Sequence, residues 1–286
     1  MVSYAMAFTT LISTAALASH MDDPAYAVVD CGYKLDDGSW GEREHAAAHV
    51  PGAVYADLGY DLAGPRTGTN GRHPLPDPHA LAQTLGRLGI TSGMQVVAYD
   101  QANGMYASRL WWLLRWLGHD AVAVLDGGLA RWRAEGRPTR GGAEPREPRA
   151  FTGSPRPDMA VDVADVAARL GTPAWRLVDA RAPERYRGEH EPIDRRPGHI
   201  PGAANHFFQW NLDEQGLFRT PEQLRARLKE SFGDVSADRV VCYCGSGVTA
   251  CHNLLALEHA GLKGARLYAG SWSEWSSDPS RPVEEG

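Results

Sequence analysis

Val-Val-Cys-Tyr-Cys-Gly-Ser-Gly-Val-Thr-Ala-Cys occupies residues 240–251. Its β-branched and aromatic start predicts a buried strand that ends at Cys244, and the apolar pattern after Thr249 predicts a helix that stops at Gly261. Two glycines and a serine between them let backbone N–H groups converge where the helix begins, and such an arrangement stabilises an anion. We therefore expect Cys244 to be a nucleophilic thiolate.

The other cysteines of this stretch fit structural roles. Cys242 lies inside the predicted strand and Cys251 lies early in the predicted helix, so both are expected to be packed in the core. A metal site built from Cys242, Cys244, Cys251 and His252 is disfavoured, because a strand directs Cys242 and Cys244 to opposite faces. No second ligand pair at finger spacing exists in the sequence. We expect neither a metal nor an organic cofactor.

The chain repeats its landmarks in the same order, which indicates two homologous domains. The matched pairs are AVVD at 27–30 with RLVD at 176–179, HVPGA at 49–53 with HIPGA at 199–203, the helices after proline at 74–90 with 218–233, VVAYD at 96–100 with VVCYC at 240–244, and LDGGLARW at 125–132 with YAGSWSEW at 268–275.

A length of 286 residues suits two domains. Residues 139–158 are rich in proline, glycine and charge, which predicts a linker between a domain at 8–138 and a domain at 159–286. Within each copy, short apolar strands alternate with helical patterns. This alternation predicts an α/β fold with a mainly parallel sheet covered by helices, in which the ligand site lies outside the carboxyl ends of the strands.

The Cys-Gly-Ser-Gly-Val-Thr loop, the paired His-(Val/Ile)-Pro-Gly-Ala elements and a late Gly-x-x-x-Trp turn resemble those of the tandem rhodanese family. The resemblance implies two rhodanese-like α/β domains, each a mainly parallel five-stranded sheet flanked by helices. It also implies a sulfurtransferase whose Cys244 carries sulfur as a persulfide. Asp100 stands at the position equivalent to Cys244, so the N-terminal domain is expected to be catalytically silent.

The residues after the cysteine separate two branches of the family. Members that prefer thiosulfate carry basic residues there, whereas this chain has the neutral Gly245 and Ser246, as in the 3-mercaptopyruvate sulfurtransferases. A neutral loop attracts a dianion less strongly but can offer the Ser246 hydroxyl to a donor thiol or carbonyl. The resemblance therefore favours 3-mercaptopyruvate as the donor, with thiosulfate as the alternative.

The resemblance also implies residues that surround the cysteine. Arg185 would bind the donor carboxylate through its guanidinium group, and Arg187 is a second candidate. His73 would work with Ser246 to move the thiol proton. The loop that holds the donor comprises Gly245, Gly247, Val248 and Thr249.

Two contacts that the family usually makes stay open in this sequence. The acid partner of His73 is not identified: Asp57 and Asp61 lie in the same stretch, but the usual acid position falls on Gly59. A second arginine before the Gly-His-Ile-Pro-Gly element does not align without a gap, and Arg195 or Arg196 could replace it.

The composition of the chain argues against some classes of binding partner. The net charge of −6 and the isoelectric point near 6.0 argue against nucleic acid and acidic membranes. No apolar run reaches the roughly 18 residues that span a bilayer. The N-terminus has no Lys or Arg before its apolar stretch, so we expect a helix capped by Ser13 rather than a signal peptide, and a cytoplasmic protein. The expected partners are a small-molecule sulfur donor and an acceptor, either cyanide or a thiol on a small molecule or a thioredoxin-like protein.

Two other functions compete with the sulfurtransferase interpretation. A cysteine phosphatase uses a similar loop but needs an arginine six or seven residues after the cysteine, where this chain has Ala250 and Cys251. A non-enzymatic module that only relays persulfide is the second alternative. An intact Cys244 together with Ser246 and Arg185 favours turnover.

Overall fold

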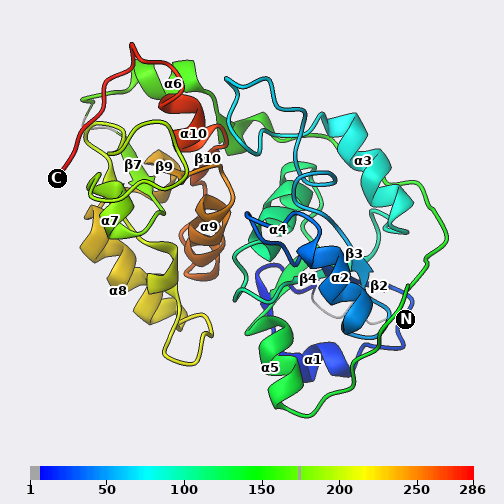
Figure 1. The fold of residues 1–286 in the computed structure, drawn as a ribbon. Helices are drawn as coiled ribbons and strands as arrows, with labels where there is room; N and C mark the ends of the chain where they lie inside the picture. The colour runs from blue at the N-terminus through cyan, green and yellow to red at the C-terminus, as the bar shows by residue number, and fades with distance from the viewer. Residues whose placement is uncertain (1–6, 173–174) are drawn as a thin grey trace. The chain divides into compact units, whose positions relative to one another are not determined.

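The computed structural model describes residues 7–172 and 175–286 and divides the chain into two compact units (Figure 1). Residues 1–6, which form the start of the segment weighed as a signal peptide, lie outside the described residues. The first unit is the chain up to Leu62 with Pro76–Arg156, and the second unit is Ala63–Leu75 with Pro157–Gly286. A short segment from the first half of the sequence is therefore part of the second unit.

The stretch predicted as a linker lies mostly in the first unit, and the chain passes to the second unit after Arg156. Arg140 forms an antiparallel bridge with His49, and the amide of Arg149 donates to the carbonyl of Gly86 at 2.8 Å. Phe151 is the buried large apolar side chain of this segment, and these backbone bonds help to hold the rest of it in place.

Five parallel strands form the sheet of the first unit in the order β1-β5-β4-β2-β3. The strands are β1 Leu11–Ile12, β2 Tyr26–Asp30, β3 Val54–Tyr55, β4 Gln95–Tyr99 and β5 Val122–Leu125. The helices are α1 Thr14–Ala18, α2 Trp40–Ala47, α3 Pro78–Arg87, α4 Ala107–Trp116 and α5 Gly128–Ala134. The Ser13 hydroxyl accepts from the amide of Ala16, which confirms the predicted start of the short N-terminal helix.

The sheet of the second unit repeats this order as β6-β10-β9-β7-β8, again with parallel pairing throughout. The strands are β6 Ala160–Val161, β7 Arg176–Asp179, β8 Ala204–Asn205, β9 Val240–Tyr243 and β10 Arg266–Tyr268. The helices are α6 Val163–Ala168, α7 Pro183–Tyr186, α8 Pro221–Phe232, α9 Thr249–His259 and α10 Ser271–Trp275. The predicted α/β fold with two parallel five-stranded sheets is confirmed.

Local chemistry places the long helices where the sequence predicts them. Thr220 and Gln223 form a reciprocal capping box ahead of α8, and Pro221 fills its first turn, where a missing N–H costs nothing. Asp77 caps α3 by accepting from the amides of His79 and Ala80, with Pro78 as the first helical residue. Because parallel strands need a crossover between them, these helices carry the chain back along the sheets.

The register of the central strands positions the functional loop. β7 pairs with β9 so that Asp179 lies beside Tyr243, and Cys244 follows at the carboxyl end of the sheet. In the first unit β2 pairs with β4 so that Asp30 lies beside Tyr99, and Asp100 follows. The two loops therefore leave equivalent points of two equivalent sheets.

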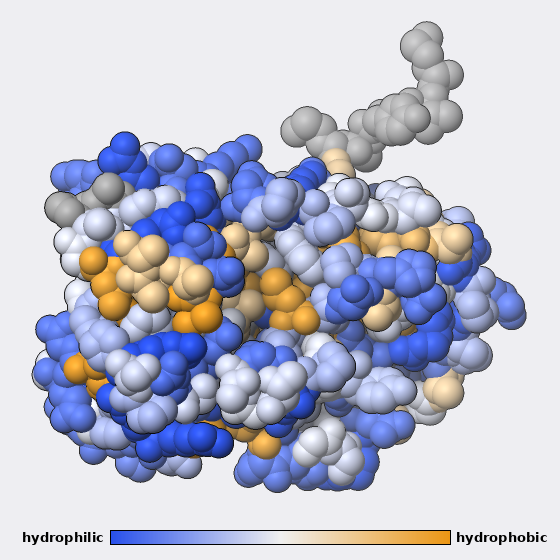
Figure 2. Space-filling model, turned by 90° about the horizontal axis from the view of Figure 1, so that it is seen from above, coloured by the Kyte–Doolittle hydropathy of each residue, from blue (hydrophilic) through white to orange (hydrophobic). Residues whose placement is uncertain are grey.

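Polar residues cover most of the face seen in Figure 2, with small apolar patches between them. Among the described residues, the exposed large apolar side chains are Leu35, Tyr60 and Ile193. No helix within the described residues combines the length and the apolar character that crossing a bilayer requires.

A buried polar network lies between the helices of the second unit. His206 is fully buried, and its two ring nitrogens lie 2.6 Å from the Ser231 hydroxyl and 2.9 Å from the Asn211 side-chain oxygen. Asn211 in turn contacts Asn253 at 2.8 Å. Burial lowers the pKa of His206 to about 4, so the ring is neutral in the folded protein at neutral pH.

This histidine makes the stability of the second unit sensitive to acid. In the unfolded chain its pKa is about 6.5, so between pH 6.5 and 4 the unfolded state binds more protons, and stability falls as the pH falls. We expect a contribution of about 2 kcal/mol to be lost between about pH 7.5 and pH 5. Urea unfolding followed by circular dichroism at both pH values, in the wild type and in His206→Gln, would measure it. An equal acid sensitivity in both proteins would contradict the prediction.

Candidate active site

The loop after β9 folds around the sulfur atom of Cys244. The side chain is 2% exposed, and the amide of Gly247 donates to its Sγ at 3.1 Å. Gly247 has φ +75°, and a Cβ there would lie 2.4 Å from the carbonyl oxygen of Ala269. Only glycine can bring its amide to the sulfur at this position.

The start of α10 fixes the backbone of this loop. The amides of Trp272 and Ser273 donate to the carbonyls of Cys244 and Gly245, each at 2.9 Å. The Ser271 hydroxyl accepts from the amide of Cys244 at 3.1 Å. Another element therefore holds the first two loop carbonyls, which fixes the backbone that carries the Gly247 amide to the sulfur.

Several of these amides are available to a bound anion. The N–H groups of Gly245, Ser246, Val248 and Thr249 donate no hydrogen bond to another residue within 7–172 and 175–286. Thr249 begins α9, whose first N–H groups have no partner inside the helix. A ring of N–H donors at a helix N-terminus stabilises negative charge on a sulfur or on an anionic ligand.

The first unit shows such a ring with an anion in it. The Asp100 carboxylate accepts from four backbone amides at 2.7–2.9 Å. The donors are Ala102, Gly104, Tyr106 and Ala107. Burial raises the pKa of Asp100 while these four N–H groups act to lower it. A carboxylate thus fills the loop of the first unit at the position that Cys244 holds in the second.

His73 and Ser246 are in direct contact within the second unit. Nδ1 of His73 lies 2.8 Å from the Ser246 hydroxyl, and the two side chains are 2% and 7% exposed. His73 belongs to the 63–75 segment. Gly71 and Arg72 of this segment contact the start of α10. The amide of Arg72 donates to the Ser273 hydroxyl at 3.0 Å, and a Cβ on Gly71 would lie 2.7 Å from the carbonyl oxygen of Gly270.

Two guanidinium groups flank the loop at Gly245. A Cβ placed on Gly245 would lie 2.7 Å from Nη2 of Arg72 and 3.7 Å from both terminal nitrogens of Arg185. Arg185 was predicted here, whereas Arg72 was missed. The signal for Arg72 was its place directly before His73, since a segment that delivers the histidine must also deliver its neighbour.

Carboxylates hold both arginines. Glu191 accepts from Nη2 of Arg185 at 2.7 Å, and Asp194 bridges Arg72 and Arg185 with its two oxygens. Burial acts to raise the pKa of Glu191, but the hydrogen bond from Arg185 and two backbone amides bring it below its usual range. Burial raises the pKa of Asp194 against the attraction of Arg72. The arginine side chains are therefore fixed before any donor binds.

Other predicted residues lie apart from this cluster. Arg187 is half-exposed and pairs with Glu189 at 2.7 Å. Arg195 is exposed, and Arg196 donates to the carbonyl of Arg281 at 3.0 Å. Within the described residues, none of these three arginines forms a hydrogen bond or ion pair with the 244–249 loop.

The two acids considered as partners of His73 belong to the first unit. Asp57 accepts from the amides of Gly59 and Tyr60, both at 2.8 Å. Asp61 accepts from the amide of Asp57 at 2.9 Å and pairs with Arg87. These bonds give both carboxylates a local structural role.

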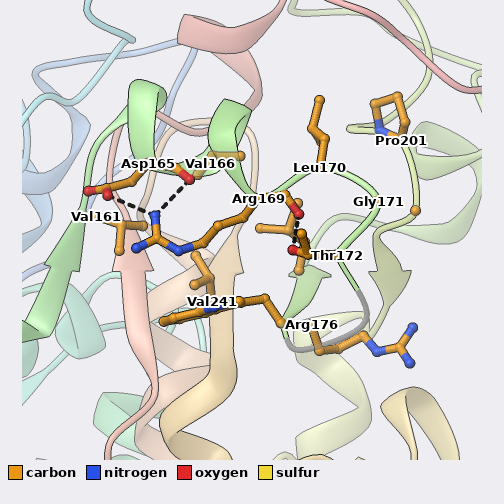
Figure 3. Close-up of a pocket in the computed structure, with 13 residues that line it drawn as sticks. Val161, Asp165, Val166, Arg169, Leu170, Gly171, Thr172, Arg176, Pro201 and Val241 are labelled. Atoms are coloured by element: carbon orange, nitrogen blue, oxygen red, sulfur yellow. Dashed lines mark hydrogen bonds and ion pairs between the residues drawn. The ribbon is translucent and has the colours of Figure 1, made fainter.

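A cavity of about 230 Å³ elsewhere in the second unit adds nothing to this site (Figure 3). Its walls include Val161, Leu177 and Val241, and at its rim Arg169 pairs with Asp165 at 2.7 Å. None of the cavity's lining residues belongs to the 244–249 loop. Among the described residues, no group of three or more His, Cys, Asp or Glu side chains is arranged to hold a metal ion.

The two units thus share one α/β architecture, with a cysteine in the loop of the second unit and a carboxylate at the same place in the first. The family described as "Rhodanese-like domain" matches residues 13–135 and 162–278. The chain therefore belongs to the rhodanese family of sulfurtransferases, as the sequence predicted.

Individual relatives share most of the chain. A Pseudomonas aeruginosa protein named "Probable 3-mercaptopyruvate sulfurtransferase" is 48% identical over 98% of this chain and 100% of its own length. The thiosulfate sulfurtransferase of Cricetulus griseus is 34% identical over 98% of this chain and 96% of its own length. The crystal structure of the 3-mercaptopyruvate enzyme SseA from Escherichia coli matches with a TM-score of 0.81 and 32% identity, covering 93% of this chain and 100% of that one.

Proposed function

We propose that the chain transfers sulfur from 3-mercaptopyruvate to cyanide or a thiol through a persulfide on Cys244. The observation that carries the proposal is a loop in which the Gly247 amide donates to Sγ of Cys244 while two guanidinium groups lie beside the neighbouring Gly245. The neutral Gly245-Ser246 sequence and the 48% identical relative support this donor over thiosulfate. We also propose a cytoplasmic location for the protein.

Each group has a part in the proposed transfer. The Cys244 thiolate attacks the donor sulfur, a sulfur–sulfur bond forms, and the carbon–sulfur bond breaks with its electron pair left on carbon. Pyruvate leaves as its enolate and takes up a proton. Arg185 binds the donor carboxylate, with Gly245, Gly247, Val248 and Thr249 lining the loop, while Arg187 stays a more distant candidate.

The second half-reaction restores the enzyme. An acceptor nucleophile attacks the outer sulfur of the Cys244 persulfide, and the sulfur–sulfur bond breaks to regenerate the thiolate. Thiocyanate forms from cyanide, and a persulfide forms from a thiol. The acceptor thiol belongs to a small molecule or to a thioredoxin-like protein. No oxidant, metal or organic cofactor takes part in either step.

A paired steady-state assay tests the proposed donor. We expect kcat/KM with 3-mercaptopyruvate and cyanide to exceed kcat/KM with thiosulfate and cyanide. Higher activity with thiosulfate would leave Cys244 in place but contradict the donor assignment. Sulfur uptake by Cys244 without turnover on either acceptor would instead identify a persulfide carrier.

The Ser246–His73 pair is expected to act as one unit in proton transfer. Ser246→Ala and His73→Gln should each lower kcat by about 10- to 100-fold, because each breaks the same 2.8 Å contact. The double variant should then be little worse than either single variant. A double-mutant cycle with 3-mercaptopyruvate measures this coupling, and multiplicative losses would show that the two residues act independently.

A further inference from the structure

The two guanidinium groups beside Gly245 share a carboxylate of the protein itself. One oxygen of Asp194 pairs with Nη1 of Arg72, and the other lies 3.1 Å from Nη2 of Arg185. The Asp194 side chain is only 3% exposed. Arg72 and Arg185 also flank Gly245. A protein carboxylate thus partly neutralises the cations that a donor meets at the loop.

Each arginine has a terminal nitrogen near the loop that does not hold Asp194, although Nη2 of Arg185, which does hold Asp194, lies equally close to Gly245. Nη2 of Arg72 and Nη1 of Arg185 donate no hydrogen bond to another residue in the described part of the chain. On each arginine, a terminal nitrogen that holds no protein carboxylate therefore lies near Gly245. An anionic donor can bind these nitrogens while Asp194 stays in place.

The charges of the arginines and carboxylates connected to Asp194 sum to zero. Three guanidinium groups meet three carboxylates in one connected set, namely Arg72, Arg181 and Arg185 with Asp179, Glu191 and Asp194. The set is neutral with Asp194 charged, and it would carry one positive charge with Asp194 neutral. A dianion gains more from that added positive charge than a monoanion does, because Coulomb energy scales with the product of the charges.

We infer that Asp194 is a specificity-determining residue that adapts the Cys244 loop to monoanionic carboxylate donors and weakens the binding of dianions such as thiosulfate. The inference rests on the proposed function, since it concerns the donor of the same site. 3-Mercaptopyruvate with a neutral thiol carries one negative charge, and thiosulfate carries two. The nearby Asp194 carboxylate repels the second charge in a site where burial limits screening by water.

Asp194→Asn tests this role while preserving the shape of the side chain and one acceptor oxygen. The ratio of kcat/KM for thiosulfate to kcat/KM for 3-mercaptopyruvate should rise about tenfold in the variant. Asp194→Glu keeps the charge and should leave the ratio near that of the wild type. Asp234→Asn is the matched control, because Asp234 is 82% exposed and pairs only with Lys229 among the described ion pairs.

The ratio separates this role from mere positioning of the arginines. If Asp194 served only to hold them, both donors would lose the same factor, and an unchanged ratio in Asp194→Asn would overturn the inference. A wild type that turns over neither donor would instead overturn the proposed function. If Asp194→Asn fails to fold, inhibition of the wild-type enzyme provides the test. The monoanion pyruvate should inhibit at lower concentration than the dianion sulfate. The reverse order would overturn the inference.

Discussion

Replacing Cys244 with serine is expected to lower kcat/KM for 3-mercaptopyruvate by a factor on the order of 10⁴ or more. The serine oxygen would occupy the same amide-lined loop, yet a hydroxyl is far less acidic than a thiol and cannot form a persulfide. The loop geometry should survive, because the Gly247 amide can donate to a hydroxyl oxygen as it does to Sγ at 3.1 Å. Loss of activity in a folded protein would then report chemistry.

Intact-protein mass spectrometry gives a second measurement of the same step. With donor and no acceptor, the wild type should gain the mass of one sulfur atom, and Cys244→Ser should gain none. Cys242→Ala is the matched control, since Cys242 is fully buried and burial raises its pKa well above the usual thiol range. It should keep the wild-type mass gain. Full turnover by Cys244→Ser would contradict the mechanism.

The sequence predicted those parts of the fold that have a local pattern. Buried runs such as Gln95–Tyr99 and Arg176–Asp179 carry enough apolar residues to be recognised as strands, and proline with a capping residue marks the starts of α3 and α8. The edge strands were not located, because β1, β3, β6 and β8 are two residues each and show no periodicity. Their number followed only from the family resemblance.

The functional site was likewise predictable from the sequence only where its residues are contiguous. Cys244 and its loop are contiguous in sequence, so the strand, the glycines and the helix start could be recognised together. The partners brought from a distance could not, because Arg72 reaches Ser273 across 201 positions and His73 reaches Ser246 across 173. No local rule predicts that 63–75 belongs to the second unit. The role of His73 could be suggested by resemblance, but the placement of Arg72 needed the structure.

Arg185→Gln is expected to raise KM for 3-mercaptopyruvate and to lower kcat/KM about 100-fold. A charge-assisted hydrogen bond from a guanidinium group to a carboxylate contributes about 1.5 to 3 kcal/mol, which corresponds to about one to two powers of ten. The donor carboxylate keeps its charge during sulfur transfer, so the loss should fall mainly on KM. Arg225→Gln serves as the control, since Arg225 pairs with Glu222 on the half-exposed surface of α8.

The structure also predicts how Arg185→Lys will differ. The arginine fork contacts Glu191 through Nε and Nη2 and Asp194 through Nη2, and a single ammonium group cannot reproduce these bonds while also facing Gly245. Lysine should therefore recover no more than about tenfold of the lost kcat/KM. Both variants leave buried carboxylates with fewer partners, so urea unfolding must accompany the kinetics. If a folded Arg185→Gln protein kept the wild-type kcat/KM, Arg185 would not bind the donor. Arg72 would then be the cation that binds the donor carboxylate.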